Sequence, residues 1–152
     1  MKNFEFEGVY QKKERLEDDH DRAVEDLARA GVVLENDNRS VDIAERDFDD
    51  ASVNHQDLYA ERAKIKKDEL ALKARFEAGD RSEALMGEIE DLKMRYEELR
   101  SLSRHSASEM NQKIDPLRSA RGAMAGSQAV VDLHENTLKE IEDGLSELEE
   151  DL

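Results

Sequence analysis

Residues 76–85 read FEAGDRSEAL, and this stretch decides the fold. It contains Gly79-Asp80-Arg81, the only clear loop signal of the sequence, since Gly and Asp are typical turn residues. On both sides, apolar or small residues recur at positions a and d of a heptad, from Phe6 to Phe76 and from Ser82 to Leu152. Two arms of equal length around one short turn predict an all-α fold, a long antiparallel two-helix coiled-coil hairpin.

The turn also sets the register of the two arms. It places Phe76 beside Leu85, and the same register places Ala44 beside Leu117. Small residues then face large ones in layer after layer, which supports the hairpin independently of the turn. We therefore expect residues 1–152 to form a single helical domain, with the first arm at about 6–77, the turn at 78–82 and the second arm at about 82–152.

Each arm has a weak segment near its middle. Residues 36–40 read NDNRS, which are poor helix formers that can cap a new helix. In the second arm, Asp115-Pro116 is a good pair for the N-cap and first position of a helix. We predict a kink or a break near 36–40 and near 113–116, with Asp37, Asp115 and Pro116 as hinge residues. Breaks in both arms would give the alternative fold, a four-helix bundle.

The composition limits the class of protein. Of the 152 residues, 41% are charged and 5% aromatic, which fits long helices better than a compact globule. The chain has no Cys, so disulfides and thiolate metal sites are excluded. No apolar run approaches the ~18 residues of a membrane span, and no apolar signal segment follows Met1. We expect a cytoplasmic protein, or one carried within a larger assembly such as a virion.

The net charge of −16 indicates the kind of partner. Direct binding to nucleic acid or to anionic membranes needs Lys and Arg, so both are disfavoured. Basic protein surfaces are favoured instead. Acidic residues gather near the ends of the two arms, and apolar residues lie at positions e and g beside the seam, where a two-helix rod leaves them half exposed. We expect protein partners, or a second copy of the chain, to bind at Glu142, Asp143, Glu147, Glu149, Glu150, Asp151, Tyr59, Met86 and Leu102.

Polar residues interrupt the seam at several positions. We interpret the seam histidines His20, His55 and His134 as polar layers that fix the register. Asp37, opposite Met124, is expected to form the worst layer, and long charged residues such as Glu69 are expected to extend outward. The sequence has no nucleophile–base pair, phosphate-binding loop or zinc motif. We therefore expect no enzymatic activity, no catalytic residue, no metal and no cofactor.

The N-terminal region resembles a known family. Phe4-x-Phe6, Val9-Tyr10 and then Ala23…Leu27-Ala28-x-Ala30 resemble the start of the FliJ/YscO family, as do the length and the near-central turn at Gly79 and Asp80. Members of that family are small coiled-coil hairpins of the flagellar and type III secretion export apparatus. The resemblance implies a central stalk for the hexameric export ATPase that also contacts the export gate and chaperones.

The residues leave three functions open. The first is a non-enzymatic coiled-coil assembly protein or adaptor, with the export stalk as its sharpest form. The second is an acidic inhibitor of the phage type, or a nucleic-acid mimic, that blocks a basic protein surface. The third is a structural component of a virion or scaffold, packed through the apolar residues beside the seam.

Overall fold

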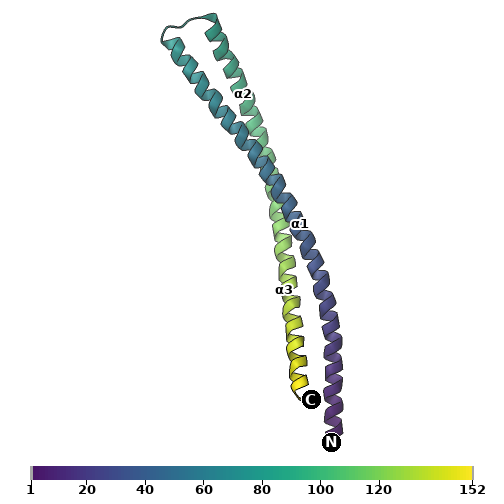
Figure 1. The fold of residues 1–152 in the computed structure, drawn as a ribbon. Helices are drawn as coiled ribbons and strands as arrows, with labels where there is room; N and C mark the ends of the chain where they lie inside the picture. The colour runs from purple at the N-terminus through teal and green to yellow at the C-terminus, as the bar shows by residue number, and fades with distance from the viewer. Residues whose placement is uncertain (1, 152) are drawn as a thin grey trace. The chain divides into compact units, whose positions relative to one another are not determined.

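The protein is all-α, as a computed structural model shows. Helix α1 spans Lys2–Glu77, α2 spans Glu83–Gln112 and α3 spans Ile114–Asp151 (Figure 1). The structure describes the backbone of residues 2–151 and the side chains of residues 8–151, and no strand occurs in that part of the chain. The prediction of long helices without a sheet is confirmed.

Helix α1 is continuous through residues 36–40, so the predicted break there is wrong. Arg39 forms a 2.7 Å ion pair with Glu35 one turn earlier, and the Ser40 hydroxyl donates to the Asn36 carbonyl at 3.1 Å. Asn and Ser each cost only a few tenths of a kcal/mol in a helix, and the segment has no Gly and no Pro, the two residues that disfavour a helix interior most. The four shorter helices of the alternative bundle are therefore not formed.

The turn lies at residues 78–82, as predicted, and local hydrogen bonds explain how it ends α1. Gly79 has φ +117, a conformation that side chains disfavour. Its N–H donates to the Phe76 carbonyl at 3.2 Å, and the Asp80 N–H donates to the Arg75 carbonyl at 3.1 Å. These two bonds form a Schellman motif, which satisfies the last carbonyls of the helix.

Side chains in the same turn begin α2. The Asp80 carboxylate accepts a hydrogen bond from the Ser82 N–H at 3.1 Å. The Ser82 hydroxyl then caps the helix by accepting from the Leu85 N–H at 3.2 Å. The hydrogen bonds from Ser82, and then the ion pair with Arg75, hold the pKa of Asp80 below its usual value.

The second arm is interrupted at Lys113, between α2 and α3, within the predicted segment 113–116. Pro116 has no N–H to donate to the Gln112 carbonyl four residues earlier, which explains why α2 ends at Gln112. Asp115 is not the N-cap that the sequence predicted, because α3 already begins at Ile114. Lys113 keeps right-handed helical angles, φ −87 and ψ −11, so the backbone irregularity is small.

Contacts divide the chain into two units. Unit 1 comprises Met1–Asp42 and Ser119–Leu152, and unit 2 comprises Ile43–Arg118. In unit 2, His55 contacts Ser106 and Arg62 contacts Tyr96, so the two helical stretches run antiparallel. In unit 1, an antiparallel order follows from contacts of His20 with Glu142 and of Asp37 with Ser127.

Burial in both units follows the heptad pattern. Among the residues whose burial is described, every a and d position except Ser82 and Lys113 is buried or half-buried. The buried residues all occupy these positions: Ala23, Ala30, Val41, Glu69, Leu85, Leu99, Ser103, Ser106, Leu117, Val131 and Leu148. The core is therefore a single stripe of a and d residues along each helix. Apolar residues outside this stripe stay exposed to solvent.

Two charged seam residues behave differently from prediction. Asp37 does not form an unpaired layer, because its carboxylate accepts a hydrogen bond from the Ser127 hydroxyl. Glu69 does not extend outward. It is only 3% exposed, and two lysines of its own helix reach its carboxylate instead, Lys73 at 2.8 Å and Lys66 at 3.8 Å.

Candidate partner-binding surfaces

The described residues contain no cluster of three or more His, Asp or Glu side chains that could hold a metal ion. Among residues 2–151 there is also no helix both long and apolar enough to cross a membrane. The predicted binding residues lie on two surfaces, an acidic one in unit 1 and a partly apolar one in unit 2.

Unit 1 carries most of the net charge. It holds 21 acidic and 9 basic residues, a net charge of −12, whereas unit 2 holds 18 acidic and 14 basic residues, a net charge of −4. The predicted binding residues of α3 are all exposed: Glu142, Asp143, Glu147, Glu149, Glu150 and Asp151. An exposed surface of one sign attracts a partner of opposite charge over several ångströms and steers its approach.

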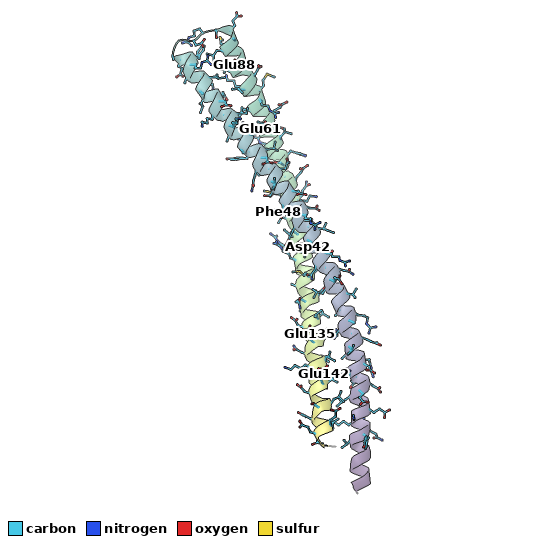
Figure 2. All side chains as sticks on the ribbon, in the orientation of Figure 1. Asp42, Phe48, Glu61, Glu88, Glu135 and Glu142 are labelled. Carbon is cyan, nitrogen blue, oxygen red and sulfur yellow. The ribbon has the colours of Figure 1, made fainter. Side chains whose placement is uncertain are left out.

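The basic residue of α3 nearest to these carboxylates in the sequence is Lys139, one turn before Asp143. Among the described side chains, Glu142 alone of the six lies within ion-pair distance of a basic residue, since Nε2 of His20 in α1 is 3.4 Å from its carboxylate oxygen (Figure 2 labels Glu142). The other five form no ion pair with the side chains of residues 8–151. By contrast, Arg39 of α1 is paired within its own helix. The α3 carboxylates after Lys139 therefore repel one another, and no ion pair with a Lys or Arg side chain offsets the repulsion within residues 8–151.

The predicted Tyr59 site in unit 2 is a small hollow of ≈ 140 Å³. Its lining comprises Tyr59, Arg62, Ala63, Lys66 and Tyr96. The Arg62 guanidinium lies 5.9 Å from the centre of the Tyr59 ring and 5.2 Å from that of Tyr96. Lys66 lies 5.0 Å from the centre of the Tyr96 ring. These are cation–π distances, and the Tyr59 side chain remains 60% exposed.

The predicted Met86 site is a second, larger hollow of ≈ 340 Å³ near the turn. It is lined by Lys73, Phe76, Glu77, Met86, Ile89, Glu90 and Lys93. Met86 is 53% exposed and its flexible thioether adapts to an incoming side chain. The hollow combines apolar walls with charges of both signs.

Leu102, the third predicted apolar site, does not join the other two. Tyr59 and Met86 both occupy position e of the heptad, whereas Leu102 occupies position g and is 46% exposed. In unit 2, the ion pair between Glu61 and Arg95, at 3.0 Å, connects positions g of the two helices (Figure 2 labels Glu61). Leu102 therefore lies along the edge of the seam that this ion pair occupies.

Sequence reasoning missed the group around Glu69. The Lys73 ammonium hydrogen-bonds the carboxylate and, with Lys66 and Lys93, holds the pKa of Glu69 below its usual value, although burial opposes this. The lysines remain partly exposed, at 48% for Lys66 and 41% for Lys73. The repeat of lysine at positions e, seven residues apart, was the signal that could have found them.

The predicted hinge residues lie near the division between the units. The chain divides after Asp42 and after Arg118, within a few residues of Asp37 in α1 and of Asp115 and Pro116 in α3. Whether the chain bends there stays a prediction.

Comparisons with known protein families, with curated proteins and with solved structures find no match for this chain.

Proposed function

We propose that this chain is a non-enzymatic assembly protein, an antiparallel coiled-coil hairpin whose acidic unit 1 binds a basic surface of another protein. The observation that carries the proposal is the set of exposed α3 carboxylates without ion pairs. Mutual repulsion among them costs stability, and a basic partner would relieve it. The paired charges elsewhere, such as Arg29 with Asp26 at 2.8 Å, need no partner of this kind.

The sharper form of the proposal is an export-apparatus stalk. It rests on the resemblance of the N-terminal residues to the FliJ/YscO family. Within that motif, Val9 is half-buried and Tyr10 is 58% exposed, while the side chains of Phe4 and Phe6 lie outside the described residues. Stimulation of a hexameric export ATPase by the full chain is the result expected of a stalk.

The same carboxylates favour a second candidate, an acidic inhibitor that blocks the basic cleft of a nucleic-acid-handling protein. Both candidates predict binding that weakens with salt, because exposed charges are screened beyond a Debye length of about 10 Å at 0.1 M. They differ in the partner: the stalk activates an ATPase, whereas the inhibitor competes with nucleic acid.

The test is affinity capture from the native host with two matched variants. The first neutralises Asp143→Asn, Glu147→Gln and Glu150→Gln on the outward face of α3. The control removes the same number of exposed carboxylates from unit 2, with Asp47→Asn, Asp49→Asn and Asp50→Asn.

We expect a partner retained by the wild type and by the control, released by salt and lost from the α3 variant. Equal retention by both variants would contradict the proposal. If the retained proteins are only nucleic-acid enzymes, the stalk is wrong and the inhibitor stands.

A further inference from the structure

One edge of the seam in unit 2 carries both hollows. Tyr59, Lys66 and Lys73 are successive e positions of α1, and Met86 and Lys93 are successive e positions of α2. Tyr59 and Lys66 line the smaller hollow, whereas Lys73, Met86 and Lys93 line the larger one. In an antiparallel pair, the e positions of the two helices face each other along one edge of the seam. This edge is called the e edge of unit 2.

The e edge of unit 2 has a basic residue in every layer and an aromatic or thioether side chain in each outer layer. By the register of the turn, its three layers pair Tyr59 with Arg100, Lys66 with Lys93, and Lys73 with Met86. The Glu69 carboxylate beneath it offsets one positive charge, Glu77 and Glu90 line the larger hollow together with Lys73 and Lys93, and Glu97 lies 3.8 Å from Arg100. The partly exposed ammonium groups are open to a further anion.

The corresponding edge of unit 1 has the opposite charge. The same register pairs Val24 with Glu135, Glu17 with Glu142, and Tyr10 with Glu149. All six side chains are exposed, among them Tyr10 at 58% and Val24 at 44% (Figure 2 labels Glu135 and Glu142). His20 lies beside Glu142 on this edge, and Lys139 is one turn from Glu135 in the sequence. Each layer therefore contains at least one carboxylate, and each outer layer adds an apolar side chain.

We propose that the e edge of unit 1 in one copy of this chain docks onto the e edge of unit 2 in a second copy. The central layers then set Glu17 and Glu142 against Lys66 and Lys93. Each outer layer sets an apolar residue and a carboxylate against an aromatic or thioether side chain and a cation. The match holds in all three layers and in either direction of docking, and such complementarity confers specificity on association.

This contact leaves the outward acidic surface of α3 free. Asp143, Glu147 and Glu150 occupy heptad positions c and f, away from the e edge. Glu142 and Glu149 belong to the e edge, whereas the variants that test binding of a basic partner change only Asp143, Glu147 and Glu150. A failure of self-association leaves the binding of a basic partner standing, and the two sets of variants separate them.

The test is sedimentation equilibrium of the full chain at about 20 mM and about 500 mM NaCl, where the Debye length falls from about 20 to about 4 Å. We expect self-association at low salt that decreases at high salt. Lys93→Glu and Glu142→Lys should each weaken it by about tenfold, since attraction across a layer becomes repulsion. Lys67→Glu and Glu150→Lys make the same charge changes at exposed f positions and should leave it unchanged.

An equimolar mixture of the Lys93→Glu and Glu142→Lys chains provides the decisive arm, because a misfolded variant cannot be rescued. Each variant supplies one intact edge that the other lost, and the reversed residues can pair across the central layer. We expect the mixture to recover mixed complexes. A chain that is monomeric at low salt, an association that the f-position controls weaken equally, or a mixture that stays dissociated would each overturn the proposal.

Discussion

Replacing Glu69 by Gln tests how a buried carboxylate can stabilise the seam of unit 2. Gln keeps the shape of the side chain and removes the charge. The main loss is the 2.8 Å hydrogen bond from the Lys73 ammonium. A hydrogen bond to a charged group typically contributes about 1.5–3 kcal/mol to the free energy of unfolding. Lys73 is 41% exposed, so solvent screening reduces the value to about 1 kcal/mol. Lys66, at 3.8 Å, adds a few tenths at most.

The pH dependence has a definite sign. The pKa of Glu69 is lower in the folded chain than in the unfolded chain, mainly because Lys73 hydrogen-bonds the ionised form. Its contribution is therefore complete above the unfolded pKa of about 4.3 and is lost as the pH falls through the folded pKa. Protonated Glu69 resembles Gln, so the difference in the free energy of unfolding between the wild type and Glu69→Gln should vanish at low pH.

The assay is urea unfolding followed by circular dichroism at about pH 7 and about pH 3, on both sides of that unfolded pKa. Glu88→Gln is the matched control, since Glu88 is exposed and forms no ion pair with residues 8–151 (Figure 2). We expect Glu69→Gln to lose about 1 kcal/mol at neutral pH and Glu88→Gln to lose almost nothing. A Glu69→Gln chain as stable as the wild type at neutral pH, or a difference that persists in acid, would refute the reasoning.

Three further predictions concern single positions, and each is checked by the same unfolding measurement. Gly79→Ala should lower the free energy of unfolding by about 1 kcal/mol, because Gly79 has a positive φ. Gly87→Ala, in open space within α2, should raise it by up to about 1 kcal/mol. A chain that Gly79→Ala stabilises and Gly87→Ala destabilises would contradict the cap geometry. Ser103→Ala should be neutral or stabilising, because the buried Ser103 hydroxyl has no hydrogen-bond partner. Ser106→Ala should cost about 1 kcal/mol, because the Ser106 hydroxyl hydrogen-bonds both His55 and the Ser103 carbonyl. Equal effects of the two substitutions would argue against these hydrogen bonds. Pro116→Ala restores an N–H at the junction of α2 and α3 and should raise the free energy of unfolding by about 1–3 kcal/mol. A lower free energy of unfolding would instead show that the interruption between α2 and α3 stabilises the fold.

Local signals made the helices and the turn predictable. A heptad repeat identifies which side chains face a neighbouring helix, and all described a and d positions except Ser82 and Lys113 are indeed buried or half-buried. Gly79 is suited to the left-handed conformation that ends α1, so the turn depends on a few adjacent residues. The exposure of the acidic α3 residues follows from their positions outside the seam in the same way.

Features that depend on contacts between residues far apart in the sequence were less predictable. The NDNRS segment has poor helix propensity, yet Arg39 and Ser40 bond within the helix and Asp37 bonds Ser127 of α3. Propensities of a few tenths of a kcal/mol per residue are overruled by such contacts. The position of Asp115 was wrong for a related reason, because the helix resumes before Pro116 instead of at it.

The sequence by itself determined the helical content, the buried stripe and the place of the turn, because periodicity and glycine conformation are properties of neighbouring residues. Only the tertiary structure decided that Glu69 stays inside, that Asp37 is partnered and that the hollows of Tyr59 and Met86 share one edge of the seam. A charge in a seam is stable or costly according to which side chains reach it. That depends on the register of two helices and on the reach of each lysine, which no single segment specifies.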